Sequence, residues 1–392
     1  MPLSKSSEIA DVDPSSGGIM FGDGALAHLE SMLIELSIDS LLLIVDQKAY
    51  AESGAKRTVM PALSCRRHDL FSDFQQNPVL DDVVAAETRL NSGKYDGILA
   101  IGGGSAIDVA KTAAVCAGQA SSLHDLITGR ASISRPGLPV IAVPTTAGTG
   151  AEVTQFAAIY VDGVKHSISH PGILPCAVLV DPLLTHSMPP SLTAATGLDA
   201  LCQAIESFWS VASTEKSRRL SRRAIELAIN HLEDAVLRPT SESRTGMSLA
   251  AHLAGQAINI TKTTAAHALS YTLTTNYGVP HGMAVAISLS PLLRYNHGVT
   301  DLDCTNPHGV DHVRTATNET IHLLGCQTIE QAVARIERLL RNINCPVRLS
   351  EVGVKTAIQR RDIASRVNAE RLGNNPRQLD TAAIVDLLES IR

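Results

Sequence analysis

The sequence is poor in aromatic residues, has only a small net charge and contains no long hydrophobic run. Aromatic residues make up 3% of its 392 residues, so no aromatic surface for stacking nucleic-acid bases is expected. The 33 Lys and Arg against 39 Asp and Glu give a formal net charge of −6, which argues against sequence-independent nucleic-acid binding. The longest aliphatic stretch, Leu41–Val45, has five residues, whereas a membrane-spanning helix needs ~20. Nucleic-acid and membrane proteins are therefore excluded.

The cysteines do not form a pattern. There are seven, an odd number, they are scattered, and none forms a C-x-x-C pair. This usage indicates reduced thiols and argues against a disulfide scaffold or a zinc ribbon. Residues 1–18 are polar and carry no apolar core of a signal peptide. A cytoplasmic protein is expected.

The two halves of the chain differ in their hydrophobic pattern. In the first half, short apolar runs alternate with amphipathic stretches, which predicts a parallel sheet covered by helices on both faces. After Pro190 long helical periodicities replace the strand pattern. We therefore predict a Rossmann-like α/β dinucleotide-binding domain over residues 1–185 and an all-α domain over residues 186–392. The expected strands are Leu41–Val45, Gly97–Ile101, Val140–Val143 and Ala177–Val180.

A glycine-rich turn follows the second of these strands. The segment GILAIGGGSAIDVAK (Gly97–Lys111) reads as a buried strand, three glycines, Ser105 and a helix. Glycines let the backbone approach an anion, and the helix N-terminus offers free N–H groups and a positive dipole end. The turn therefore suits a pyrophosphate. An ordinary tight turn is the alternative for this segment taken alone.

A second polar loop, PTTAGTGAEVT (Pro144–Thr154), follows the strand Val140–Val143. Loops after parallel strands meet at the carboxyl edge of the sheet, where ligands bind in open α/β sheets. Asp46 ends the first strand and could accept hydrogen bonds from the ribose hydroxyls of NAD while repelling a 2′-phosphate. The alternative for Asp46 is a helix or turn cap.

Polar side chains interrupt the apolar helices of the second half. Asp199 and Gln203 are four residues apart and share a helix face, as do His267 and Tyr271. A Gly-x-Pro break places His281 at the start of the next helix. Asp199, His267 and His281 would suit a two-His, one-carboxylate metal site with an open position for a carbonyl oxygen. Each residue alone also suits a core or capping role.

With these motifs, the chain resembles the iron-containing (group III) alcohol dehydrogenases. The resemblance covers FGDGALAHL (Phe21–Leu29), the Asn77–Pro78 pair, VDPLLTHSMPP (Val180–Pro190) and the segments above. It implies a nucleotide-binding domain, a helical domain and a divalent metal in the cleft between them. It places Asp199, His267 and His281 at metal-ligand positions, and Asp46 at the position that discriminates NAD from NADP. The cofactor-binding residues that it implies are Asp46, Asn77, Gly103, Gly104, Ser105, Asp108, Thr145, Thr146, Thr149 and Lys165.

Three positions depart from the family pattern. Gln203 stands where the family has a His ligand, Tyr271 where it often has a second His, and Ala151 where a Ser is expected. An amide oxygen can coordinate a metal, so Gln203 is kept as a candidate ligand. Three-ligand and metal-free sites remain open.

One branch of the family, its phosphonoacetaldehyde reductases, is more similar. The likeness lies in QAIESFWSVAST and KTTAAHALSYTLT, which include Gln203 and Tyr271. It implies reduction of phosphonoacetaldehyde, a small anionic aldehyde, to 2-hydroxyethylphosphonate in phosphonate metabolism. The implied cofactors are NADH, with NADPH as the alternative, and Fe²⁺, with Zn²⁺ as the alternative. A homodimer is expected.

The expected chemistry is metal-assisted hydride transfer. The metal polarises the aldehyde oxygen and the nicotinamide supplies the hydride. Tyr271 is the candidate proton donor, although a packed aromatic ring is an equal alternative. Lys262, the one cation in residues 258–277, is the candidate anchor of the phosphonate, although it could also be a solvated helix cap. Three alternative functions remain: a same-fold dehydrogenase for an uncharged aldehyde or diol, a lyase or cyclase of the glycerol-dehydrogenase and dehydroquinate-synthase group, and an inactive nucleotide-binding homologue.

Overall fold

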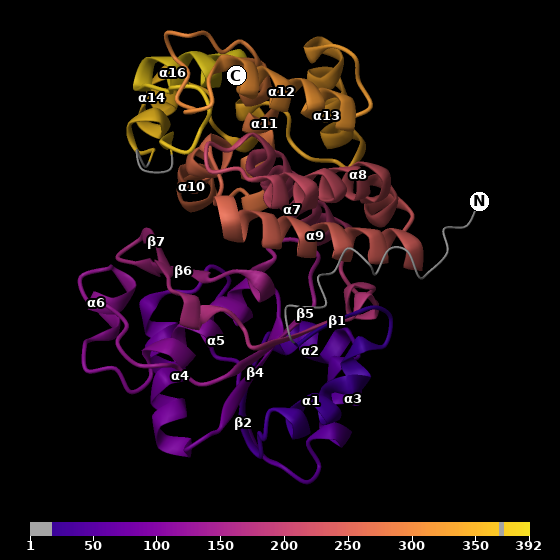
Figure 1. The fold of residues 1–392 in the computed structure, drawn as a ribbon, viewed down its shortest axis with the longest axis vertical. Helices are drawn as coiled ribbons and strands as arrows, with labels where there is room; N and C mark the ends of the chain where they lie inside the picture. Colours follow the sequence, from indigo (N-terminus) through magenta and orange to yellow (C-terminus); the bar gives the residue numbers. More distant parts are fainter. Residues whose placement is uncertain (1–17, 368–371) are drawn as a thin grey trace. The chain divides into compact units, whose positions relative to one another are not determined.

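The chain folds into two compact units (Figure 1). The structure is a computed structural model that describes residues 18–367 and 372–392. Its units are Met1–Met188, the N-terminal domain, and Pro189–Arg392, the helical domain. The sequence placed this division between residues 185 and 186.

The N-terminal domain contains a six-stranded parallel sheet with the order β1-β8-β5-β4-β2-β3. This confirms the predicted α/β fold. The strands are β1 (Ile19–Phe21), β2 (Ser40–Val45), β3 (Arg67–Phe71), β4 (Gly97–Gly102), β5 (Val140–Pro144) and β8 (Ala177–Val180). The helices are α1 (Leu29–Glu35), α2 (Gln47–Glu52), α3 (Ala55–Ala62), α4 (Leu80–Gly93), α5 (Gly104–Cys116) and α6 (Leu123–Ile127).

Helices cover both faces of this sheet (Figure 1). Alternate residues of a strand point to opposite faces. Leu41 and Leu43 accordingly pack in one core cluster with Leu29 of α1 and Val59 of α3. The intervening side chains of β2 pack in a second cluster with residues of α4 and α5. Both faces are therefore buried, which explains why β2, β4 and β5 read as continuous apolar runs.

Three parts of this domain were not predicted: the edge strands β1 and β3, and the antiparallel hairpin of β6 (Phe156–Val161) and β7 (Val164–Ser169). No residue of β3 is fully buried, and its sequence RHDLF has no apolar run. An edge strand of this kind gives no hydrophobic pattern that would distinguish it from a loop.

All the regular elements described in the helical domain are α-helices, apart from short 3₁₀ turns. It contains α7 (Pro190–Trp209), α8 (Glu215–Leu237), α9 (Ser241–Thr261), α10 (Ala265–Tyr277), α11 (His281–His297), α12 (Val310–Leu323), α13 (Ile329–Asn342), α14 (Ala357–Ser365) and α16 (Thr381–Ser390). Pro190 is the first residue of α7, a position that tolerates its missing N–H. Across the described residues, none of the helices has the length and apolarity needed to cross a membrane.

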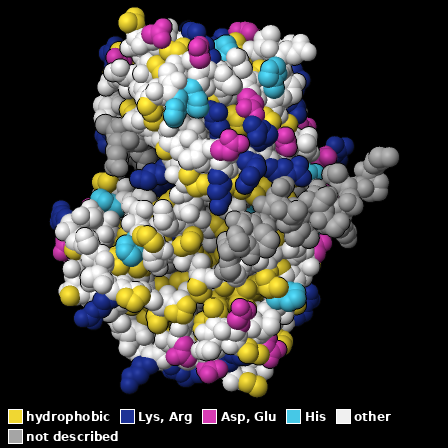
Figure 2. Space-filling view, viewed as in Figure 1, with side chains coloured by type: hydrophobic (Ala, Val, Ile, Leu, Met, Phe, Trp, Pro, Cys, Tyr) yellow, Lys and Arg dark blue, Asp and Glu magenta, His cyan; other side chains and the backbone are white. Residues whose placement is uncertain are grey.

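The visible surface of the helical domain carries charges of both signs. Lys and Arg side chains lie among Asp and Glu side chains on the face drawn in Figure 2. Ion pairs of this domain include Arg222–Glu319, Arg341–Glu337 and Arg377–Asp303. Acidic and basic groups thus neutralise one another locally.

Candidate functional site

The loops predicted to bind the nucleotide follow three neighbouring strands. The β2, β4 and β5 strands are adjacent and parallel, so their carboxyl ends lie at one edge of the sheet. Asp46 N donates to Ile101 O at 3.0 Å, and Thr145 N donates to Gly102 O at 3.0 Å. The structure therefore brings together the loops that start at Asp46, Gly103 and Thr145.

The glycine-rich turn and the second loop are in close contact. A Cβ on Gly104 would lie 2.8 Å from Thr149 Cγ2, and a Cβ on Gly103 would lie 3.3 Å from Thr146 Oγ1. Larger residues would push the two loops apart. Gly104 is also the first residue of α5, so the backbone here has the openness and the helix N-terminus that a pyrophosphate requires.

Several of the predicted cofactor residues also have structural partners. Ser105 Oγ accepts from Asn77 N at 3.3 Å, and Asp108 Oδ2 accepts from Ala158 N of the hairpin at 3.0 Å. Burial raises the pKa of Asp108, against the lowering effects of Lys111, the Ala158 N–H and Lys165. The Thr145 hydroxyl is buried and has no hydrogen-bond partner within the described part of the chain. Lys165 lies on β7.

Asp46 has the capping role that was the alternative to ribose binding. It is the N-cap residue of α2, and its Oδ1 accepts from Ala49 N at 2.9 Å. A capping carboxylate still carries its negative charge and a second oxygen. Ribose recognition by Asp46 therefore stays a prediction.

Lys111 supports the second loop and was missed by the sequence reasoning. Its ammonium is fully buried and donates to Ala151 O at 2.8 Å, Thr154 Oγ1 at 3.1 Å and Phe156 O at 2.6 Å. Burial lowers the pKa of Lys111 to about 8, although the negative charges of Asp108 and Glu152 oppose this. A single Lys within a helical segment gives no sequence signal of these contacts.

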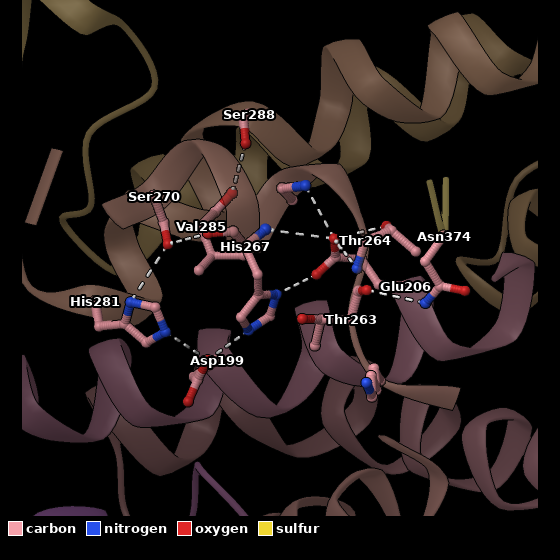
Figure 3. A network of polar contacts seen from close by, with 12 residues as sticks. Asp199, Glu206, Thr263, Thr264, His267, Ser270, His281, Val285, Ser288 and Asn374 are labelled. Atoms are coloured by element: carbon pink, nitrogen blue, oxygen red, sulfur yellow. Dashed lines mark hydrogen bonds and ion pairs between the residues drawn. The ribbon is translucent and has the colours of Figure 1, made fainter. Parts of the chain in front are cut away.

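The three predicted metal ligands converge in the helical domain (Figure 3). Their ligand atoms lie within 4.8 Å of one another. Asp199 Oδ1 of α7 is 3.2 Å from Nε2 of His267 on α10 and 3.9 Å from Nε2 of His281 on α11. The α10 helix ends at Tyr277 and α11 begins at His281, as the Gly-x-Pro break predicted.

Glu206, on the same face of α7, contacts His267 from the opposite side and was also missed (Figure 3). Its Oε2 is hydrogen-bonded to Nδ1 of His267, and the side chain is fully buried. Burial alone would lower the pKa of His267, but the negative charge of Glu206 and hydrogen bonds to Asp199 and Glu206 raise it to about 10. An ion that binds Nε2 therefore displaces a proton.

The residues around this cluster fit a divalent metal. One carboxylate and two imidazoles form a donor set that suits Fe²⁺ or Zn²⁺. Gln203 lies one helical turn from Asp199, and its side chain is 4% exposed. Its Oε1 has no hydrogen-bond partner among the described residues. Since buried polar atoms are usually paired, this oxygen has the character of a ligand whose partner is a bound ion.

Of the remaining candidates, Tyr271 lies next to one of these ligands and Lys262 lies in the loop that precedes α10. The rings of Tyr271 and His281 are stacked, with centroids 6.2 Å apart and an interplanar angle of 9°. Lys262 is exposed and follows α9 directly. Thr264 Oγ1 donates to Glu206 Oε1 at 2.7 Å and accepts from Trp209 Nε1 at 3.1 Å. The Thr264 hydroxyl is thus occupied within the site, and Lys262 is kept as the candidate anion-binding group of this loop.

Comparisons with known proteins agree with this geometry. The family description "Iron-containing alcohol dehydrogenase" matches residues 16–182, and that of the C-terminal part of the same family matches residues 193–392. The chain is 36% identical to a phosphonoacetaldehyde reductase from Streptomyces viridochromogenes over 79% of each chain. It is 31% identical to a long-chain-alcohol dehydrogenase from Geobacillus thermodenitrificans, over 88% of this chain and 89% of the relative.

A solved structure is also similar over nearly the whole chain. It is the sulfoacetaldehyde reductase from Bifidobacterium kashiwanohense in complex with NAD⁺. The TM-score is 0.85 at 29% identity, over 95% of this chain and 96% of the other. The chain therefore belongs to the iron-containing alcohol dehydrogenase family and is an oxidoreductase.

Proposed function

We propose that this protein uses NADH and a divalent metal to reduce phosphonoacetaldehyde to 2-hydroxyethylphosphonate. The observation that carries the anionic substrate is the conformation of Lys262. This residue has φ 58° and ψ −175°, a backbone region that is almost restricted to glycine and costs a side-chain-bearing residue ~1–3 kcal/mol. Such strain persists where the surroundings hold it, and it is concentrated at functional sites.

Hydrogen bonds hold this strained loop on both sides of Lys262. Asn374 Nδ2 donates to Thr261 O at 2.7 Å and to Thr263 O at 3.0 Å, and Thr261 Oγ1 donates to Lys262 O at 2.8 Å. Thr264, two residues further on, is fixed by Glu206, which also binds His267. The backbone of Lys262 is thus fixed five residues before a candidate metal ligand. An aldehyde whose second carbon carries a phosphonate needs a cation near the group that binds its carbonyl oxygen.

Different groups have separate roles in the proposed reaction. When bound, the metal supplies a Lewis acid for the aldehyde oxygen, and NADH supplies the hydride. Asp199, His267 and His281 hold the metal, with Gln203 Oε1 as a neutral fourth ligand. The aldehyde carbon gains the hydride and its oxygen gains a proton, which we assign to the Tyr271 hydroxyl.

The nucleotide is held by the N-terminal domain in this proposal. Gly103, Gly104 and the N-terminus of α5 receive the pyrophosphate, and Asp46 accepts hydrogen bonds from the ribose. The NAD⁺ complex of the similar sulfoacetaldehyde reductase supports NAD as the nucleotide. The other residues of the proposed nucleotide-binding set are Asn77, Ser105, Asp108, Thr145, Thr146, Thr149 and Lys165.

Two of the similar proteins support a small anionic aldehyde. The names of the Streptomyces relative and of the solved structure refer to two-carbon aldehydes that carry a phosphonate and a sulfonate. The similarity to the long-chain-alcohol dehydrogenase leaves an uncharged substrate as the competing function. We also propose that the enzyme is a cytoplasmic homodimer. Size-exclusion chromatography with light scattering would test whether it is a dimer.

A panel of aldehydes tests the substrate. NADH oxidation would be followed with phosphonoacetaldehyde, sulfoacetaldehyde, acetaldehyde and lactaldehyde, with Fe²⁺ or Zn²⁺ added and NADPH in parallel. The highest kcat/KM is expected for phosphonoacetaldehyde. A preference for sulfoacetaldehyde would retain the anionic class and reject the phosphonate. A preference for acetaldehyde or lactaldehyde would reject both.

The variant Lys262→Ala tests the anion-binding group. A charge-assisted hydrogen bond contributes ~1.5–3 kcal/mol, so KM for phosphonoacetaldehyde should rise by about ten- to a hundred-fold. Acetaldehyde reduction should change little. Lys94 is a suitable control because it also has a positive φ, 52°, at the end of a helix, so Lys94→Ala should affect neither substrate. Equal losses of activity on both aldehydes in Lys262→Ala would indicate a structural role.

A further inference from the structure

We infer that Glu206 is a positioning residue that holds His267 with Nδ1 protonated, so that Nε2 is the atom that binds the metal. This inference rests on the metal binding in the proposed function and is independent of the substrate. Glu206 is not one of the predicted ligands. It acts through the ring of His267, from the side opposite to Asp199 (Figure 3).

One oxygen of Glu206 is fixed by the start of α10. Oε1 accepts from Thr264 N at 3.1 Å, Thr264 Oγ1 at 2.7 Å and Ala266 N at 2.9 Å, with a longer contact of 3.4 Å to His267 N. The side chain of the N-cap residue, Thr264, makes no capping hydrogen bond to this helix. Glu206 therefore provides the cap, and its carboxylate cannot rotate without breaking these bonds.

The other oxygen then determines the state of the imidazole. Oε2 contacts Nδ1 of His267, and a carboxylate can only accept a hydrogen bond there. Nδ1 must therefore carry its proton. In the metal-free protein Nε2 donates to Asp199 Oδ1 at 3.2 Å, and an ion that binds on this side displaces that proton and takes the Nε2 lone pair. A metal ligand of this kind commonly donates its second N–H to a carboxylate.

His281 has a matching arrangement. Ser270 Oγ donates to His267 O at 2.8 Å, so its oxygen is left to accept from Nδ1 of His281 at 3.4 Å. Nε2 of His281 then faces Asp199, at 3.9 Å from Oδ1. Both imidazoles thus present Nε2 to the same carboxylate, which is the arrangement that one shared ion requires.

The variant Glu206→Gln would reverse this arrangement with little change of shape. Three donors converge on the position of Oε1, so the amide oxygen must occupy that position. The amide NH₂ then faces Nδ1 of His267 and donates to it. Nδ1 becomes an acceptor, the ring proton moves to Nε2, and Nε2 loses the lone pair that would bind a metal.

The test is the affinity of the full-length protein for Zn²⁺, measured by competition with a chelator at one fixed pH. Loss of such an outer partner typically costs ten- to a hundred-fold in metal affinity, and this loss is expected for Glu206→Gln. Trp209→Phe is the matched control. It removes the other bond to the Thr264 hydroxyl without touching His267, and should keep the wild-type affinity. Thermal unfolding of the metal-free proteins establishes that each variant is folded.

The outcomes separate the inference from the proposed function. A wild-type protein that binds no Zn²⁺ would contradict both. Wild-type metal affinity in folded Glu206→Gln, or an equal loss in Trp209→Phe, would overturn only the role of Glu206. Should Glu206→Gln fail to fold, ring-nitrogen NMR of the zinc-bound wild-type protein gives the answer. The ring-nitrogen signals of His267 are those that disappear in His267→Gln. They should show a protonated Nδ1 and a metal-bound Nε2. A protonated Nε2 and a metal-bound Nδ1 would overturn the inference.

Discussion

Gln203 is one of the residues at which the sequence departs from the ligand pattern that the family resemblance implies. It combines a buried side chain with a carbonyl oxygen that has no partner among the described residues. If Gln203 is a neutral ligand, Gln203→His should tighten metal binding by about tenfold or more, because imidazole is a stronger donor to Zn²⁺ and Fe²⁺ than an amide. Chelator competition measures this change. Equal affinity in the two proteins would mean that Gln203 is only packed beside the site.

The charge of Asp46 can be tested separately from its capping role. Asn caps a helix about as well as Asp, so Asp46→Asn should keep the bond to Ala49 N and the stability of α2 while removing the negative charge. Relative use of NADPH should then rise because the 2′-phosphate is no longer repelled. The ratio of kcat/KM for NADH and NADPH is the measurement. A wild-type enzyme that already prefers NADPH would show that Asp46 is not the discriminator.

At the residue scale, the sequence predicted the candidate metal ligands but not the residue that hydrogen-bonds to one of them. Asp199, His267 and His281 were visible because polar residues interrupt apolar helices. Glu206 was not, although its spacing of seven residues from Asp199 puts it on the same helix face. Its partners lie about sixty residues further along the chain, and helix periodicity carries no information on such contacts.

Among the elements, the hairpin of β6 and β7 is bound to α5 by two side chains, Asp108 and Lys111. Lys111 donates to the loop before the hairpin and to β6 itself. Lys111→Met should lower the free energy of unfolding by about 2–4 kcal/mol, because buried acceptors lose their donor and Asp108 loses a neighbouring positive charge. NADH affinity should fall as the second loop loosens.

Urea unfolding and NADH titration measure the two effects of this substitution. The exposed Lys56 offers a control, since Lys56→Met should change neither quantity. Unchanged NADH affinity in a destabilised Lys111→Met would show that the second loop does not depend on this anchor.

At the element scale, the strands that could be predicted from the sequence are those that are fully buried. Strands β2, β4, β5 and β8 are buried at every position, and all four were predicted from their apolar runs. The strand β3 and the hairpin strand β7 have mixed burial and were missed. Turn chemistry was a better guide in the helical domain, where Gly278 adopts φ 67° as the C-cap of α10 and His281 begins the next helix.

For the whole molecule, the alternation of patterns predicted the fold class, and the ordered motifs predicted the family. The spatial convergence of Asp199, His267 and His281 could not be derived from spacing, because it depends on how α7, α10 and α11 pack. Gly282 shows the tightness of that packing, since a Cβ there would lie 1.8 Å from Ala195 O of α7. The residue that follows a candidate ligand must therefore be glycine for α11 to approach α7.

The central claim is that Asp199, His267 and His281 hold a divalent metal that NADH-dependent aldehyde reduction requires. The most direct measurement is metal content and turnover in the same samples of wild-type protein, before chelation, after chelation and after addition of Fe²⁺ or Zn²⁺. Turnover should disappear and return with the metal while NADH affinity stays constant, and His281→Ala should lose both metal and turnover. Full turnover in the stripped wild-type protein, or stoichiometric metal in both His281→Ala and Asp199→Ala, would contradict the claim.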